Sequence, residues 1–148
     1  MLDPCLYNEL MKNKRAYIPA LIMLMIIFAF SSQNGTQSGA LSTSLYHWLA
    51  SHFSLPFSQE TMTFLIRKCA HMTEFGILSL SWAYGLAKNE CAHPFLYALS
   101  LTFASACLDE GHQLFVSGRA GQFTDCLIDS MGGLLFLSIE KKKKKARH

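Results

Sequence analysis

The sequence predicts an all-α integral membrane protein, namely a bundle of four transmembrane helices in a single domain covering residues 1–148. Two observations support this prediction. Apolar residues make up 51% of the chain and charged residues only 16%, whereas ordinary soluble domains carry roughly 25% charged residues. The apolar residues also gather in four blocks, each near the length that crosses a bilayer core of about 30 Å.

The four predicted spans cover approximately residues 16–33, 66–87, 94–115 and 121–139. Pro19 and Pro94 fall in the first turns of the first and third spans, where a missing backbone N–H costs little. The first block is followed by Ser31-Ser32-Gln33-Asn34 rather than by a small-x-small cleavage site. We therefore expect the first block to remain as a membrane anchor.

A short amphipathic helix is predicted at the membrane interface between the first two spans, at about residues 40–53. Leu41, Leu45, Trp48 and Leu49 repeat there at helical spacing, with polar residues between them. Trp48 would anchor this helix at the interface. Ser58 follows as the predicted N-cap of the next helix.

The basic residues predict the orientation of the chain. If the N-terminus is cytoplasmic, every basic residue except Arg67, Lys68 and Arg119 lies on the inner side. Such an excess of inner Lys and Arg favours cytoplasmic N- and C-termini. The basic tail, residues 140–148, is expected to be solvated and to touch anionic inner-leaflet lipid. A nucleic-acid partner is not expected, because no folded basic face accompanies the tail.

A cluster of ionisable residues interrupts the apolar blocks near their predicted outer ends. Its members are Glu74, Asp109, Glu110, Asp125, Asp129, His71 and His112. Counting residues from the inner boundaries places His71, Glu74, Asp109, Asp125 and Asp129 roughly 5–12 Å below the outer boundary. The first block reaches this layer at Ser31, Ser32 and Gln33. Because a charge within a span costs at least about 2.5–3.5 kcal/mol, a shared polar pocket facing the extracytoplasmic side is predicted.

Helical spacing places the polar residues of each span on one face. The sets are Arg67, His71 and Glu74; Asp109, His112 and Gln113; and Asp125 and Asp129. Arg119 lies in the tight turn between the last two spans, from which it could fold over the carboxylates. Gly132 and Gly133 permit close helix contact lower in the fourth span.

Three motifs resemble the signatures of the VanZ-like membrane protein family. The first is Phe30-Ser31-Ser32-Gln33 with Ser38 and Ser42. The second is Arg67-Lys68-x-Ala70-His71-x-x-Glu74-Phe75-Gly76-x-Leu78. The third is Asp109-Glu110-x-His112-Gln113-x-Phe115-x-x-x-Arg119, continuing to Asp125-x-x-x-Asp129-x-x-Gly132. The founding member of this family is associated with resistance to teicoplanin, so the resemblance implies a cell-envelope role.

One functional hypothesis is a binding protein without catalytic activity, which takes a membrane lipid or a lipid-linked cell-wall precursor and thereby affects glycopeptide susceptibility. Arg67, Lys68 and Arg119 would hold a phosphate group, because guanidinium forks match phosphate oxygens. The acids would bind sugar or amine groups. The full predicted binding set is Ser32, Gln33, Arg67, Lys68, His112, Gln113, Arg119, Asp125 and Asp129.

The alternative hypothesis is a membrane-embedded hydrolase or transferase acting on a lipid headgroup. His71 or Glu74 would serve as the general base, Asp109 or Glu110 as its partner, and Arg119 would stabilise developing phosphate charge. In a metal-assisted version, a divalent metal would be held by a set of four side chains. That set is His71, Glu74, Asp109 and His112. Transport is disfavoured, because the inner halves of the spans carry no matching polar residues.

Overall fold

The computed structural model describes residues 12–146, with the side chain of Lys144 excepted, and this part of the chain contains helices and no strand. The elements are η1 Lys14–Tyr17, α2 Ile18–Ser31, α3 Gly35–His52, α4 Gln59–Lys88, α5 Pro94–Gln113 and α6 Phe123–Ala146. The prediction of an all-α fold is therefore confirmed.

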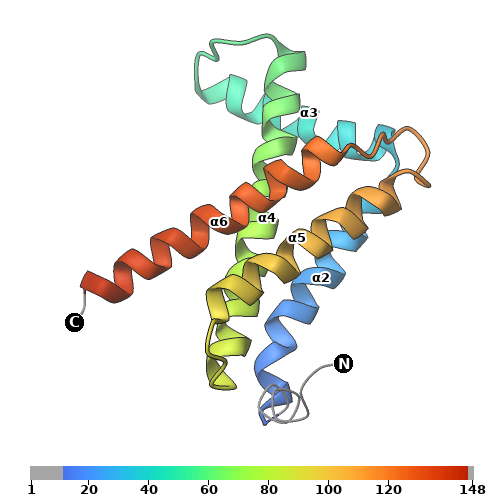
Figure 1. Cartoon of the computed structure of the whole chain (residues 1–148). Coiled ribbons are helices and arrows are strands. Elements are labelled where there is room, and N and C mark those ends of the chain that lie inside the picture. The colour runs from blue at the N-terminus through green and yellow to red at the C-terminus, as the bar shows by residue number, and fades with distance from the viewer. Residues whose placement is uncertain (1–11, 147–148) are drawn as a thin grey trace.

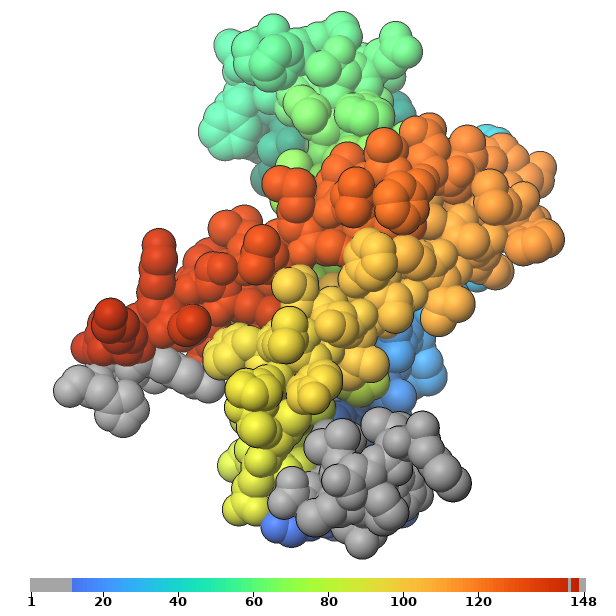
Figure 2. All heavy atoms as spheres, in the orientation of Figure 1, coloured from blue at the N-terminus to red at the C-terminus, as the bar shows by residue number. Residues whose placement is uncertain are grey.

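The longest helix, α4, is the centre of the fold and contacts all the other helices (Figure 1). Helices α2 and α5 run beside it, while α6 crosses it obliquely and its C-terminal half projects away from the other helices. Helix α3 lies across α4 near its N-terminal end. The space-filling view shows this end of α4, together with α3, standing out beyond α6 (Figure 2).

Local sequence signals account for the ends of several helices. Asn34 caps α3 by accepting a hydrogen bond from the Gln37 backbone, while the Gln37 side chain accepts one from the Asn34 backbone. This reciprocal box satisfies two N–H groups that a helix start leaves without partners. Ser58 caps α4 by accepting from the Thr61 N–H, as predicted.

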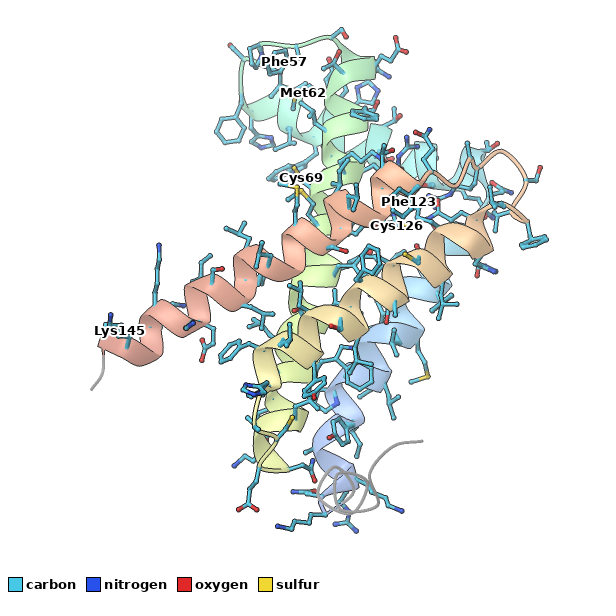
Figure 3. All side chains as sticks on the ribbon, viewed as in Figure 1. Phe57, Met62, Cys69, Phe123, Cys126 and Lys145 are labelled. Carbon is cyan, nitrogen blue, oxygen red and sulfur yellow. The ribbon has the colours of Figure 1, made fainter. Side chains whose placement is uncertain are left out.

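The apolar core follows α4 and consists of two clusters. The first contains Ala20, Ile27, Phe75, Leu78, Ala106 and Cys126, and the second contains Ala83, Leu86, Cys91, Ala98 and Leu137. The outward-facing side chains drawn in Figure 3 include many large apolar ones. Close packing of α6 on α4 depends on Gly132, where an added Cβ would collide with the backbone carbonyl of Met72.

Hydrogen bonds to the backbone connect segments that are distant in the sequence at two places, the first through the Asn89 side chain. Fully buried Asn89, after α4, accepts the Asn13 N–H at 2.6 Å and donates to the Asn13 carbonyl at 3.3 Å. At the opposite end of the bundle, the Gly35 N–H donates to the Ser117 carbonyl at 3.1 Å. Gly118 lies in the left-handed region with φ of 73°, and it is so close to Gly35 that a Cβ on Gly35 would overlap its carbonyl.

The observed bounds correct several predicted ones. The helix predicted at 40–53 begins at Gly35, because of the Asn34 cap, and the helix that contains the predicted span 66–87 begins at Gln59, directly after its predicted cap Ser58. The third helix ends at Gln113 rather than 115, and the fourth begins at Phe123 rather than 121. Helix α6 continues to Ala146, so most of the predicted basic tail is helical, which agrees with the good helix propensity of lysine. Residues 147 and 148 of that tail lie outside the described residues.

Length and composition support one of the four predicted spans. Among residues 12–146, the stretch Lys14–Ser31 alone is long and apolar enough to cross a membrane by these measures, with a mean hydropathy of 1.6. Helices α4, α5 and α6 combine their apolar residues with Ser, Thr and ionisable residues. These polar residues lower the mean hydropathy of the three helices.

Candidate functional site

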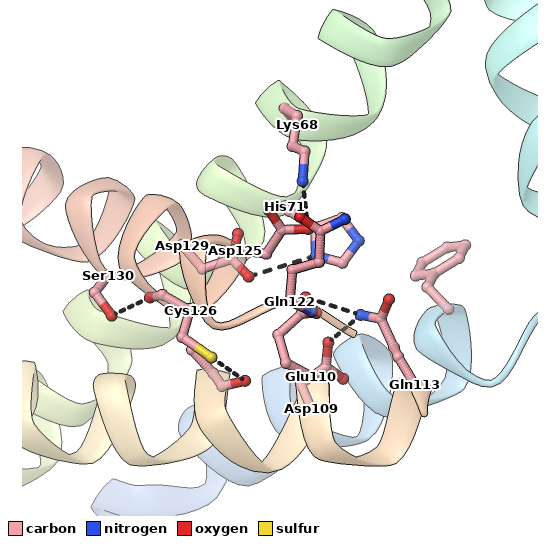
Figure 4. Close-up of polar contacts among 12 residues, drawn as sticks. Lys68, His71, Asp109, Glu110, Gln113, Gln122, Asp125, Cys126, Asp129 and Ser130 are labelled. Carbon is pink, nitrogen blue, oxygen red and sulfur yellow. Dashed lines mark hydrogen bonds and ion pairs between the residues drawn. The ribbon is translucent and has the colours of Figure 1, made fainter. Parts of the chain in front are cut away.

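A polar cavity of about 310 Å³ lies between α4, α5, α6 and the segment that joins α5 to α6. We call it the headgroup cavity. Its polar lining comprises Arg67, Lys68, His71, Glu110, Gln113, Arg119, Gln122, Thr124, Asp125 and Asp129. The close-up in Figure 4 shows how α4, α5 and α6 bring most of these side chains together.

Two charge pairs connect α4 with α6 along this cavity. The Lys68 Nζ lies 2.5 Å from the Asp125 Oδ2, and each of these side chains is 18% exposed. One turn further along both helices, the His71 Nδ1 lies 3.8 Å from the Asp129 Oδ2, a distance too long for a hydrogen bond. The paired residues are three positions apart in α4 and four apart in α6, and both spacings place them on one face of their helix.

The wall formed by α5 is held by hydrogen bonds to two carboxylates. The Gln113 side-chain amide donates to the Asp109 Oδ2 at 2.9 Å and to the Glu110 Oε1 at 3.2 Å. The Glu110 Oε2 accepts the backbone N–H of Gln122 at 2.9 Å. Glu110 thereby fixes the segment that precedes α6, and with it one side of the headgroup cavity.

Three buried oxygens near the cavity lack a hydrogen-bond partner within the described part of the chain. They are the Ser31 Oγ, the Asp109 Oδ1 and the Asp129 Oδ2. A buried acceptor without a partner costs about 1–3 kcal/mol. Asp129 is 2% exposed and lines the headgroup cavity, and the nearest charged partner of its Oδ2 is the His71 ring at 3.8 Å.

Arg119 binds the end of α2 instead of a carboxylate. Its Nε donates to the Gln33 carbonyl at 3.1 Å and its Nη2 to the Phe30 carbonyl at 3.2 Å. The predicted fold of Arg119 over the acids is thus replaced by a backbone contact. Burial, and after it the charge of Arg67, lower the pKa of Arg119, so the two guanidinium groups interact with each other.

Arg67 has no anionic partner. Among the side chains that the structure describes, no carboxylate lies within ion-pair distance of it, and it makes no hydrogen bond. It lines the headgroup cavity beside Arg119 and is half-buried. Two neighbouring cations without an anion between them are destabilising in isolation, so this arrangement favours a bound anion.

A second, smaller cavity of about 170 Å³ lies between α2, α3 and α4, and most of its surface is apolar. We call it the apolar cavity. It shares Arg67, His71 and Arg119 with the headgroup cavity, so the two meet at these side chains. Glu74 lines the apolar cavity and not the headgroup cavity. The predicted catalytic residues are therefore divided between two spaces.

Four further predicted site residues lie outside the lining of the headgroup cavity. The Ser32 Oγ and the His112 Nε2 are 3.1 Å apart and pair with each other, and the His112 ring packs edge-on against Phe28. Gln33 contributes its carbonyl to Arg119 and lines the apolar cavity. Asp109 lies behind Glu110 and Gln113, fully buried and outside the lining of both cavities.

The side chains of the predicted metal site are separated. Within residues 12–146, no three His, Cys, Asp or Glu side chains form a group that could hold a metal ion. Of the predicted set, His71 and Glu74 face the apolar cavity, whereas Asp109 is enclosed by α5 neighbours and His112 is paired with Ser32. The described residues therefore do not bring the four side chains of the predicted metal set together.

Ser31 was predicted to lie in the polar layer but was not included in the binding set, and Gln122 was not predicted. Ser31 is 1% exposed and lies beside Asp109; its spacing of four residues from buried Ile27 places it on the packed face of α2 and was the signal for it. Gln122 contributes its backbone N–H to Glu110. No sequence pattern identifies a backbone donor of this kind, because it depends on how the preceding segment folds back.

Comparison with known proteins identifies one family. The sequence model described as VanZ/LLP1 matches residues 16–141, which covers all six helical elements except the ends of η1 and α6. No curated protein matches the chain, and no solved structure does.

Proposed function

The chain belongs to the VanZ/LLP1 family, and from this membership we propose that it is a multi-pass membrane protein that binds a phosphate-containing headgroup. The headgroup would belong to a membrane lipid or a lipid-linked cell-wall precursor. It would enter the headgroup cavity from the extracytoplasmic side.

Four membrane-spanning helices are supported by the apolar side chains that α2, α4, α5 and α6 direct outward. Exposed examples are Leu21, Met25, Leu96, Leu108, Met131 and Leu134. Such a surface is too large for a soluble monomer and fits contact with lipid. Helix α4 has 30 residues and is about 45 Å long at 1.5 Å per residue, which exceeds a bilayer core of about 30 Å. Its first turns and α3 would then lie at the outer interface.

The proposed orientation, with both termini cytoplasmic, can be tested by labelling with a membrane-impermeant maleimide in intact cells. Ser54, between α3 and α4, and Ala92, between α4 and α5, are exposed loop positions at opposite ends of the bundle. We expect Ser54→Cys to be labelled above the wild-type background, and Ala92→Cys to be labelled only after the cells are permeabilised. Labelling of Ala92→Cys alone in intact cells would reverse the orientation.

The observation that carries the proposed function is Arg67, a half-buried cation without an anionic partner among the described residues and next to Arg119. A phosphate between the two guanidinium groups would remove their repulsion and accept hydrogen bonds from both. Arginine is well suited to this role, because its planar fork matches phosphate oxygens and its charge is retained under all physiological conditions.

The opposite side of the headgroup cavity supports recognition of a second group. The carboxylates of Asp125, Asp129 and Glu110 line this side, and carboxylate oxygens can accept more than one hydrogen bond each. An amine or sugar hydroxyl attached to the phosphate would supply further donors to them. Arginines on one side and carboxylates on the other thus favour a headgroup that combines phosphate with donor groups.

Native mass spectrometry of the purified protein, released from detergent micelles, tests the proposed function. The probes are phosphatidic acid and diacylglycerol with identical chains, so they differ only in the phosphate. We expect phosphatidic acid to be retained at least about tenfold more strongly, since charge-assisted hydrogen bonds contribute about 1.5–3 kcal/mol each. Equal retention of the two lipids would contradict phosphate recognition.

A specific observation favours an enzymatic second candidate. His71 lies at the meeting point of the two cavities and is paired at 3.8 Å with Asp129, as a general base paired with an orienting carboxylate would be. The same measurement separates the candidates, because it gives the mass of the bound lipid. Unchanged phosphatidic acid supports binding, whereas conversion by the wild-type protein and not by His71→Ala supports catalysis.

In the cell, the proposed headgroup binding would affect susceptibility to glycopeptide antibiotics. The founding member of the family is associated with teicoplanin resistance, and a protein that binds a lipid or precursor headgroup at the outer leaflet would change what the antibiotic meets there. This step rests on family membership together with the proposed headgroup binding.

A further inference from the structure

We propose that the apolar cavity receives the hydrocarbon chain of the ligand next to its phosphate, so that the protein recognises an amphiphile and not a headgroup alone. The inference rests on the proposed function and extends it, since it assigns an occupant to a space that phosphate binding leaves unused.

The two cavities are joined at the charged residues that would hold the phosphate. Arg67, His71 and Arg119 line both. A phosphate at this point would therefore have a polar space on one side and an apolar space on the other. Since a phospholipid phosphate carries a polar substituent and a glycerol with its chains on opposite sides, the order of chemical groups in the ligand matches the order of the two cavities.

Away from the residues that the two cavities share, apolar side chains from three helices form most of the surface of the apolar cavity. Phe30 comes from α2, Leu41 and Leu45 from α3, and Ile66 and Ala70 from α4. Leu41 and Leu45 are one turn apart on the same face of α3, and they are 57% and 44% exposed. An acyl chain would cover part of this exposed apolar surface, at roughly 25 cal/mol per Å².

The polar groups of this cavity do not oppose a hydrocarbon occupant. The Ser42 hydroxyl donates to the Ser38 carbonyl at 3.0 Å within α3, so its hydrogen-bonding demand is met. Glu74 follows His71 on the same face of α4, where a glycerol hydroxyl next to the phosphate could donate a hydrogen bond to its carboxylate. At about 170 Å³, the cavity would hold only the part of one chain nearest the phosphate, and the remainder would extend into the bilayer.

Two probes that differ only in their chain test this inference, namely glycerol 3-phosphate and a lysophosphatidic acid with one acyl chain. Binding to the full chain in detergent is measured for each by native mass spectrometry. We expect Leu45→Trp, which fills the cavity, to weaken lysophosphatidic acid binding at least about tenfold, the order of one lost buried leucine-sized contact. Glycerol 3-phosphate binding should remain within about twofold of the wild-type value.

A matched control and a second variant complete the experiment. Ser44→Trp introduces the same side chain at an exposed position of α3 outside the cavity and should leave both probes unaffected. Leu41→Ser adds no bulk at an exposed position, so it should fold even if Leu45→Trp does not, and it should weaken only the lysophosphatidic acid.

The possible outcomes separate this inference from the proposed function. If Leu45→Trp and Leu41→Ser bind lysophosphatidic acid as the wild type does while Arg67→Gln binds neither probe, the chain does not occupy the apolar cavity, although phosphate recognition stands. If Arg67→Gln binds both probes like the wild type, phosphate recognition fails as well. Selective loss of the acylated probe in both leucine variants supports the inference.

Discussion

Replacing Arg67 with glutamine is expected to weaken retention of phosphatidic acid about tenfold to a hundredfold. The substitution keeps a polar side chain of similar reach but removes the charge that would face the phosphate together with Arg119. Hydrogen bonds to charged groups contribute about 1.5–3 kcal/mol, and each 1.4 kcal/mol is a factor of ten in affinity. Native mass spectrometry against the diacylglycerol of the same chain length measures the loss.

Two further variants test whether the loss of retention is specific to the Arg67 side chain. Arg67→Lys keeps the charge without the planar fork and should fall between the wild type and Arg67→Gln. Arg15→Gln removes an exposed arginine from η1, at the other end of the bundle, and should leave retention unchanged. If Arg67→Gln and Arg15→Gln behaved alike, the general positive charge of the protein would account for retention and the assigned phosphate site would be wrong.

The second large effect is expected at Gly132, where alanine should destabilise the fold by about 1–3 kcal/mol, the usual cost of overpacking a tight contact. A Cβ at this position of α6 would overlap the carbonyl oxygen of Met72. Backbone cannot yield as the end of a side chain can, so α6 would have to move away from α4 and the Lys68–Asp125 and His71–Asp129 pairs would separate. Thermal unfolding of the purified protein in detergent should show a lower midpoint.

Gly111→Ala is the matched control for the effect of glycine itself. Gly111 also lies within a helix, but a Cβ there would meet no atom within 4 Å. Alanine should therefore raise the unfolding midpoint slightly, because it is favoured over glycine in helices by up to about 1 kcal/mol. A Gly132→Ala protein as stable as the Gly111→Ala protein would mean that α4 and α6 pack less closely than described.

Much of the helical architecture could be predicted because it depends on local signals. The apolar blocks, the early prolines and the Ser58 cap each act within a few residues, and they placed helices in the correct order. The start of α3 was placed too late because the Asn34–Gln37 box was not recognised in a stretch without apolar periodicity. The end of α6 was placed too early because the lysine run was interpreted by its charge and not by its helix propensity.

The candidate site was less predictable because its geometry depends on how helices lie against each other. Spacing alone placed His71 on one face of its helix and Asp125 and Asp129 on one face of theirs, and these faces meet in the structure. Spacing could not show that α3 forms one wall of the apolar cavity. It therefore could not show that Glu74 lines this cavity whereas Asp109 lines neither cavity. The target of Arg119 likewise depends on the position of the α2 end, which no local pattern specifies.

The backbone contact between Gly35 and Gly118 has a mechanical consequence. It attaches the start of α3 to the segment that carries Arg119, and Arg119 is in turn bonded to the last carbonyls of α2. Helix α3, which lines the apolar cavity, and Arg119, which lines both cavities, are therefore mechanically coupled. We expect an occupant that displaces α3 to displace Arg119 as well, so that both cavities change size together.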